Sequence, residues 1–333
     1  MTIEPNSTRM FCEAAEAASV VKAQIKENAP TVARIARRLQ ADPPPFIVTV
    51  ARGSSDHAAC FAKYLFETRT GLFTASAGPS VFSVYHRKMS FANSLCILIS
   101  QSGASPDLLA AASAARDAGA FVVAVVNVMD SPLAGLADEV LAMHAGPETS
   151  VAATKSFIAS LSAAIQVTAA WQQDDELAQA LHRAPEHLEQ AWDSNWDEAL
   201  EPLSGGGDLY VLGRGLGLGI AYEAALKFKE VCALHASSFS SAEVMHGPVT
   251  IARAHFPVLV LAQNDETLPG VRKLTADLSE RGVKLLTAGL SEPGTITLPS
   301  PATHAVIEPM LRIQSFYRMV NALSVKLGMN PDQ

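Results

Sequence analysis

The sequence predicts an α/β protein with two tandem, doubly wound domains, each built on a central parallel sheet. Two observations carry this prediction. Short apolar runs rich in β-branched residues alternate with helical segments, which is the order of buried parallel strands joined by helical crossovers. The same order starts again after the glycines at 205–207, so we interpret the chain as a tandem duplication. Its length of 333 residues also suits about two domains.

The first half begins with a helical pattern over residues 7–40, which the prolines at 43–45 end because proline has no backbone donor. A buried strand is expected at 46–50 and a helix at 56–68, with a small polar turn between them. The remaining elements of this half are strands at 94–99, 120–126 and 140–143 and helices at 106–118 and 151–171.

The second half follows a stretch of changed composition. Residues 172–200 are rich in glutamine, aspartate and glutamate with spaced leucine, alanine and tryptophan, which fits an amphipathic helix. Strands are expected at 209–212 and 257–261, with a helix at 220–234 between them. We therefore divide the chain into an N-terminal helical segment at 1–45, a first domain at 46–172, a linker helix at 173–204 and a second domain at 205–333.

Composition and charge exclude several classes of protein. Hydrophobic residues make up 49% of the chain and charged residues 17%, which excludes a disordered or fibrous protein. The net charge of -8 and the lack of a Lys/Arg run argue against nucleic acid or an anionic membrane as partner. No stretch approaches the roughly 18 apolar residues of a membrane span, and the first residues do not resemble a signal peptide. We expect a cytoplasmic protein that acts on a small molecule.

The motifs predict neither a metal nor an organic cofactor. The glycines at 213–219 fail the dinucleotide fingerprint, because Leu218 or Ile220 stands where the motif requires Gly or Ala. The cysteines are far apart and form no C-x-x-C pair, so buried free thiols are expected instead of a disulfide framework or a zinc site. They are Cys12, Cys60, Cys96 and Cys232.

Two loops of the first half are rich in hydroxyl groups. In an open parallel sheet, ligands bind beyond the carboxyl ends of the strands, where loops lead into helix N-termini. Helix-start amides and hydroxyls there can hold a phosphate monoester without Lys or Arg. The alternative is that these residues are ordinary helix caps and turn formers. The residues are Ser54 and Ser55 in the first loop and Ser100, Gln101, Ser102 and Ser105 in the second.

Four motifs in the chain resemble the SIS (sugar isomerase) family. They occur in the order found in the isomerase half of glucosamine 6-phosphate synthase, and the resemblance runs from about Phe46 to the C-terminus. It implies two tandem SIS domains with the flavodoxin-like, doubly wound fold. The motifs are S-Q-S-G-A-S at 100–105, E-T-S-V-A-A-T-K-S-F at 148–157, E-A-A-L-K-F-K-E at 223–230 and E-V-M-H-G-P at 243–248.

The resemblance also implies a site and roles for its residues. Both hydroxyl-rich loops would bind the sugar phosphate, Val151 would give the sugar a backbone contact, and Lys155 would be structural. Glu230 would be the base that moves a proton between C1 and C2, with Lys227 as a possible relay. His246 would open the sugar ring and reach the site from a neighbouring subunit, so a homodimer is implied.

The spacing of these residues agrees with such chemistry. Glu223, Lys227 and Glu230 stand at i, i+4 and i+7 and share one helical face. Glu and His are the usual groups for an aldose–ketose proton transfer and for ring opening. The alternatives are a solvated Glu-Lys-Glu helix face and a histidine whose only role is in the loop before Gly247.

Two departures from the synthase narrow the expected function. Thr2 stands where the glutaminase domain carries its nucleophilic cysteine, and the chain has no room for that domain, so no glutaminase activity is expected. The sequence stops before the synthase's tail with its closing lysine, so either the tail is absent or the given chain is cut short, and no Schiff-base lysine is assigned. The preferred prediction is a glucosamine 6-phosphate deaminase that yields fructose 6-phosphate and ammonia without a cofactor. Alternatives within the fold are a plain phosphosugar isomerase, an aminogalactose-phosphate enzyme and a fructosamine-phosphate deglycase. A sugar-phosphate sensor would use the same loops but has no need of Glu230 and His246.

Overall fold

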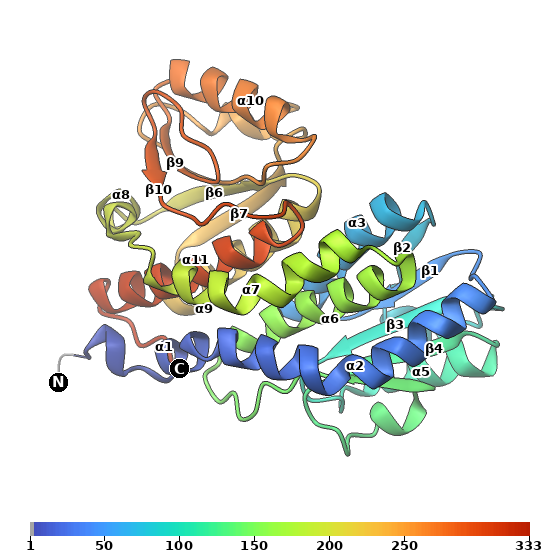
Figure 1. Cartoon of the computed structure of the whole chain (residues 1–333). Coiled ribbons are helices and arrows are strands. Elements are labelled where there is room, and N and C mark those ends of the chain that lie inside the picture. The colour runs from blue at the N-terminus through green and yellow to red at the C-terminus, as the bar shows by residue number, and fades with distance from the viewer. Residues whose placement is uncertain (1–2) are drawn as a thin grey trace. The chain divides into compact units, whose positions relative to one another are not determined.

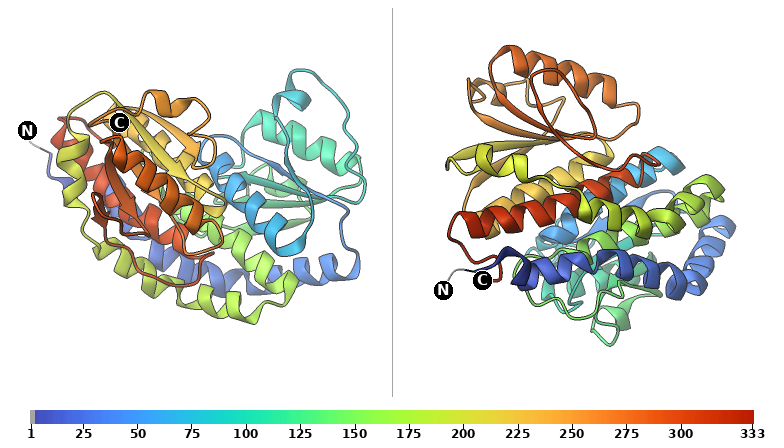
Figure 2. Two further views of the ribbon diagram at one scale, coloured as in Figure 1. Left: turned by 90° about the horizontal axis from the view of Figure 1, so that it is seen from above. Right: turned by 60° about the vertical axis from the view of Figure 1, so that its left-hand side comes forward.

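Residues 3–333 are described in a computed structural model, and they form two compact units with one parallel sheet each (Figure 1). The sheet-A unit comprises Ser19–Pro147 and Ser156–His182. The sheet-B unit comprises the chain up to Ala18, Glu148–Lys155 and Arg183–Gln333. Figure 2 shows each sheet with its flanking helices from two further directions.

Sheet A has five parallel strands in the order β2-β1-β3-β4-β5. This is the flavodoxin-like order, in which the direction of winding reverses between β1 and β3 and leaves a crevice at the carboxyl ends of these two strands. The strands are β1 (Ile47–Val50), β2 (Thr74–Ser76), β3 (Leu95–Ser100), β4 (Phe121–Val126) and β5 (Glu139–Ala142).

Helices cover both faces of sheet A, which is why its central strands are apolar on both sides. Alternate residues of the strands pack with α4 and α5 on one face and with α2, α3 and α6 on the other. The helices are α2 (Ala17–Ala41), α3 (Ser54–Thr70), α4 (Ser80–Ser83), α5 (Pro106–Asp117) and α6 (Lys155–Gln172), and the short 3-10 turn η2 (Ala134–Leu136) precedes β5.

Sheet B repeats this topology. Its order β10-β9-β8-β6-β7 is that of sheet A when the strands are counted from the start of the second half. Its strands are β6 (Asp208–Gly213), β7 (His235–Ser240), β8 (Pro257–Leu261), β9 (Lys284–Ala288) and β10 (Ile296–Leu298).

The sheet-B core lies between the sheet and helices on its two faces. Helix α10 packs against one face, and α9 packs against β6 and β7 and against α11. Phe228 and Phe316 join α9 to α11, with ring centroids 5.1 Å apart. The remaining helices of the chain are α1 (Arg9–Ala15), α7 (Asp175–Asp193), α8 (Leu200–Leu203), α9 (Leu216–Cys232), α10 (Leu268–Glu280) and α11 (Glu308–Lys326), with 3-10 turns η1 (Pro5–Ser7), η3 (Asp197–Ala199) and η4 (Pro248–Thr250).

The predicted fold class is confirmed, and several elements differ in detail. Strands β2, β7, β9 and β10 are additional to the predicted ones. The helical pattern at 7–40 is divided at Glu16 into α1 and α2. The helix predicted from residue 151 begins at Lys155, because the Glu148 side chain accepts a hydrogen bond from the Thr154 amide and residues 148–154 form a loop. No helix of residues 3–333 is long and apolar enough to cross a membrane.

Candidate active site

The two hydroxyl-rich loops lie side by side at the switch point of sheet A. The strands before them, β1 and β3, pair directly, with Val50 opposite Leu98. The helices after them, α3 and α5, have Gly53 and Ser105 as N-cap residues: Gly53 has no side chain, and the Ser105 side chain does not cap α5. These helix starts therefore keep donors for an anion, as the sequence predicts for a phosphate site.

Within the second loop, the side chains divide into turn formers and accessible groups. The Ser100 hydroxyl is buried and accepts a hydrogen bond from the Gly103 amide at 3.1 Å, so it shapes the turn. Gly103 has φ +60°, and a Cβ there would lie 2.2 Å from the Ser131 hydroxyl. The other predicted residues are exposed at Ser102 and half-buried at Gln101, Ser105, Ser54 and Ser55.

An ion pair that the sequence did not predict joins the two loops. Arg52, directly after β1, pairs with Asp107 in the first turn of α5. Half of the Arg52 side chain is exposed, so the pair places a cation at the edge of the predicted phosphate site. No local motif signals it, because the partners are 55 positions apart and meet only through the strand order.

The sheet-B unit holds the predicted catalytic helix face on α9. The Lys227 ammonium lies 3.2 Å from the Glu223 carboxylate and 2.6 Å from that of Glu230. Lys227 and Glu223 are fully buried, whereas 28% of the Glu230 side chain is exposed. The alternative of a solvated Glu-Lys-Glu face therefore does not hold for Glu223 and Lys227.

The protonation of this cluster follows from its geometry. Burial works against the charged form of Lys227, but the two carboxylates outweigh it and raise the pKa of Lys227. Lys227 stays an ammonium and holds Glu230 by a charge-assisted hydrogen bond. The arrangement presents one partly exposed carboxylate, which can take a proton from carbon, backed by a cation that stabilises it.

Tyr317 of α11 brings a further carboxylate into the same electrostatic environment. Its buried hydroxyl donates to Glu223 at 3.4 Å. Its pKa lies well above the usual value, first through burial and then through the negative charges of Glu223, Glu148 and Glu230. Glu148 is the first residue of loop 148–154, which carries Val151. Carboxylates of this loop and of α9 therefore both raise the pKa of the Tyr317 hydroxyl. No role for Glu148 was predicted from the sequence, although Glu148 begins the same motif as Val151 and could have been noticed for that reason.

Val151 lies on the surface of loop 148–154, with 63% of the residue exposed. Lys155, four residues further along the same motif, is buried, and its ammonium lies 2.6 Å from the Glu16 carboxylate. Loop 148–154 thus presents Val151 to solvent, while Lys155 is held inside the unit.

His246 is exposed in the turn after β7, and the structure does not bring it to Glu230. Helix α9 starts beyond the carboxyl end of β6 and runs back, so Glu230 lies toward the amino edge of sheet B. His246 follows the carboxyl end of the parallel neighbour β7.

The switch point of sheet B is filled by a side chain of the protein. Gln263, after β8, donates to the Arg214 carbonyl oxygen at 2.8 Å, across the gap to the loop after β6. A Cβ on Gly217 would lie 2.5 Å from the Gln263 side-chain oxygen. In sheet B, the Gln263 side chain therefore bridges the loops after β8 and β6.

We searched residues 3–333 for side chains that could together hold a metal ion. Among residues 3–333, no group of three or more His, Cys, Asp or Glu side chains is placed to hold a metal ion. Cys96 and Cys232 are buried and form no disulfide, and burial raises the pKa of each thiol to about 12. Cys60 is half-buried, and Cys12 is exposed, which corrects the expectation of a buried thiol there.

Comparison with protein families finds one match that covers most of the chain. The family model described as the SIS domain matches residues 45–170 and 203–324. A curated relative, the isomerizing glutamine–fructose-6-phosphate aminotransferase of Methanothermobacter thermautotrophicus, is 32% identical over 305 residues. The match covers 86% of this chain and 50% of the relative, so the chain spans about half the length of the curated relatives it matches.

Two solved structures are similar over nearly the whole chain. One is a Silicibacter pomeroyi protein provisionally assigned as a phosphosugar isomerase, with 41% identity, a TM-score of 0.93 and coverage of 98% of this chain and 100% of that one. The other is the C-terminal domain of glucosamine-fructose-6-phosphate aminotransferase from Francisella tularensis, with 25% identity, a TM-score of 0.88 and coverage of 98% of both chains.

Proposed function

The chain belongs to the SIS domain family, and from this premise we propose that it is a phosphosugar isomerase that deaminates glucosamine 6-phosphate to fructose 6-phosphate and ammonia. The observation that carries the proposal is the partly exposed Glu230 carboxylate held by the buried Lys227 ammonium. A related aminotransferase acts, by its name, on fructose 6-phosphate. We propose that this chain acts on a sugar phosphate with the same carbon skeleton and catalyses the reaction in the direction that releases ammonia.

The proposed reaction balances with water as the second reactant. Ring opening gives the aldehyde, Glu230 removes the proton from C2, and a proton returned to C1 leaves an imine at C2. Water adds to this imine and ammonia leaves, so a C–N bond is broken and the C2 ketone forms. Lys227 stabilises Glu230 when it is charged and can relay its proton.

Binding of the substrate phosphate is assigned to the loops of sheet A. Their uncapped helix starts and hydroxyl groups supply donors, and Arg52 adds a cation at the edge. We propose that Ser54, Ser55, Ser102 and Ser105 face the phosphate, whereas Ser100 keeps the turn in shape.

Ring opening is assigned to His246 of a second copy of the chain. Glu230 lies in the last turn of α9 and His246 in the turn after β7, where its side chain is exposed. This exposure and the family resemblance support a homodimer in which each copy lends His246 to its neighbour.

A direct assay tests the proposed function. Purified protein is mixed with glucosamine 6-phosphate without cofactor, and ammonia and fructose 6-phosphate are measured over time. Equal release of both is expected, and Glu230→Gln should reduce turnover by about 1000-fold or more while leaving the Kd for the sugar phosphate within about threefold. Turnover that survives in Glu230→Gln would remove Glu230 as the base.

A plain aldose–ketose isomerase is the second candidate. The similarity over the whole chain to the Silicibacter pomeroyi protein favours it. Interconversion of a neutral hexose 6-phosphate pair without ammonia release, and no reaction with the amino sugar, would decide for this candidate. A thermal shift with sugar phosphate and no turnover of either substrate would instead identify a sensor.

A further inference from the structure

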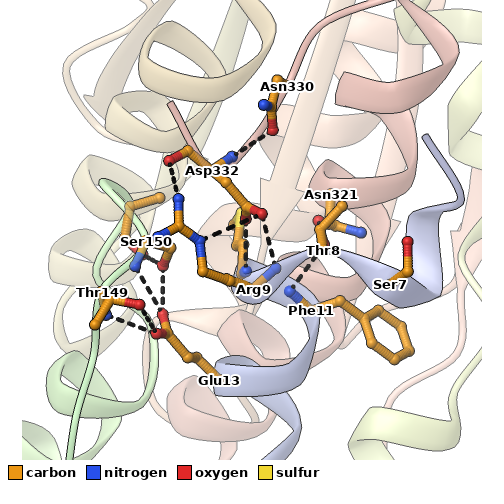
Figure 3. Close-up of polar contacts among 12 residues, drawn as sticks. Ser7, Thr8, Arg9, Phe11, Glu13, Thr149, Ser150, Asn321, Asn330 and Asp332 are labelled. Atoms are coloured by element: carbon orange, nitrogen blue, oxygen red, sulfur yellow. Dashed lines mark hydrogen bonds and ion pairs between the residues drawn. The ribbon is translucent and has the colours of Figure 1, made fainter. Parts of the chain in front are cut away.

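Helix α1 contacts the loop that carries Val151 through one carboxylate. The first Glu13 oxygen accepts hydrogen bonds from the Thr149 amide at 2.6 Å and its hydroxyl at 3.0 Å. The second accepts from the Ser150 amide at 3.1 Å and its hydroxyl at 2.6 Å (Figure 3). Four donors from two consecutive residues therefore converge on one side chain of a separate helix.

The protonation of Glu13 agrees with this arrangement. Glu13 is buried. Burial alone would raise the pKa of its carboxyl group, but the four hydrogen bonds outweigh burial and lower it. Glu13 is therefore a charged group whose two oxygens are both used to hold the loop.

A second contact ties the other end of the same loop to α1. Glu16, at the C-terminal end of α1, forms the ion pair with Lys155, whose ammonium is buried. Between these two contacts lies Val151, which is exposed. The loop is thus held on both sides of the residue that the family resemblance assigns to the sugar.

Helix α1 is in turn held on α11 by buried polar contacts. Gln314 donates to the Ala14 carbonyl oxygen at 2.9 Å, and the Thr8 hydroxyl donates to Asn321 at 2.6 Å. Asp332 accepts hydrogen bonds from the first α1 amides, those of Arg9 and Met10, at 2.9 Å each (Figure 3). A carboxylate at this end of a helix also interacts favourably with its dipole.

Helix α11 is also the helix that contacts the α9 cluster. Tyr317 of α11 donates to Glu223, which pairs with Lys227. Both the loop and the catalytic helix face are therefore positioned relative to α11, the loop through Glu13 and the helix face through Tyr317.

We propose that Glu13 is a positioning residue, which holds loop 148–154 so that Val151 and Glu148 keep a fixed distance from Glu230. The proposal rests on the proposed function for its catalytic consequence. Small displacements of a group that orients substrate can cost about 100-fold in rate. In this proposal, loop 148–154 supplies the residue that contacts the sugar, and Glu13 of α1 holds that loop in position.

The test compares Glu13→Gln with Glu27→Gln. The Glu13→Gln side chain has nearly the same shape but presents an amide NH₂ where two donors now meet a carboxylate oxygen, so about half of the hydrogen bonds are lost. Glu27 lies on α2, is 53% exposed and pairs with its neighbour Lys26, so it serves as a control for loss of one negative charge.

The first readout is amide hydrogen exchange without substrate. Glu13→Gln should speed exchange by about 10-fold or more at whichever of the Thr149 and Ser150 amides faces the new NH₂ group, and leave the amides of α9 unchanged, since a lost hydrogen bond exposes only its own donor. Unchanged protection at these two amides would overturn the proposal. This readout does not depend on any enzymatic activity.

The second readout separates positioning from mere stability. In Glu13→Gln, kcat with the sugar phosphate should fall by about 10- to 100-fold. The Kd for the product should change by less than about threefold, because the phosphate loops are untouched. A wild-type kcat in Glu13→Gln would refute positioning, whereas an inactive wild-type protein would refute the proposed function.

Discussion

Lys227 shows how a single buried charge organises the candidate site. A lysine is rarely buried unless it is paired, and here two carboxylates of its own helix pair with it. Glu223 has no access to solvent and Glu230 keeps some. The same ammonium therefore joins the buried Glu223 to Glu230, the carboxylate that we propose as the base.

Lys227→Met should destabilise the protein by about 3 kcal/mol, because it leaves the Glu223 carboxylate buried without its cation. Chemical denaturation measures this change in the free energy of unfolding. Adding Glu223→Gln to Lys227→Met should recover part of the loss, and a double variant no more stable than the single one would contradict this explanation.

The Glu13 contacts predict a pH dependence with a definite sign. The pKa of Glu13 is lowered in the folded protein from an ordinary value of 4.5, so its contribution to stability is complete above that pH. The contribution is lost as the pH falls below 4.5 through the lowered value. Exchange at the Thr149 and Ser150 amides should stay slow at pH 5 and speed up in more acidic buffer beyond the intrinsic trend. In Glu13→Gln this additional acid effect should be absent.

At the scale of elements, the course of the strands was more predictable than the loops between them. Apolar runs such as Leu95–Ser100 identify themselves because both sides of a central parallel strand are buried. The edge strand β7, with the sequence HASSFS, has no such pattern and was not predicted. The helix predicted at 151–171 begins only at Lys155, after a loop in which Glu148 accepts a hydrogen bond from the Thr154 amide and Glu13 accepts one from the Thr149 amide.

The candidate site could be predicted only as separate motifs. Sequence spacing correctly placed Glu223, Lys227 and Glu230 on one helix face, since i, i+4 and i+7 repeat the helical period. Arg52 and Glu13 could not be found in this way, because each meets its partner through the tertiary fold.

The turn after β3 depends on glycine, and Gly103→Ala tests this dependence. Its φ of +60° and the 2.2 Å approach of a Cβ to Ser131 both oppose any side chain. The substitution should cost about 1–3 kcal/mol of stability and raise KM for the sugar phosphate. Gly205→Ala is the control, because a Cβ there meets no atom within 4 Å. Equal effects of the two substitutions would contradict the predicted role of the turn.

At the scale of the whole molecule, the proposed homodimer makes a quantitative prediction. Glu230→Gln and His246→Ala homodimers should each be nearly inactive. After the two are unfolded together and refolded as a mixture, mixed dimers should regain activity, because one of their two sites combines an intact Glu230 with an intact His246. Half of an equal mixture is mixed dimers, so about one quarter of wild-type activity is expected. No recovery would assign both residues to the same chain or the protein to another assembly.

The sheet-B unit is made of three separate stretches of chain, and α1 is capped by Asp332. During synthesis, Glu13 is among the first and Asp332 among the last of the described residues to be made. The hydrogen bonds between α1 and Asp332 can therefore form only when synthesis of these residues is almost complete. Until then its apolar face, including Met10, lacks the surface that buries it. The contacts of α1 with Asp332 therefore form in a late step, after the C-terminal residues have been made. A tag fused directly behind Asp332 would act on this step, whereas a tag on a long spacer would leave it intact.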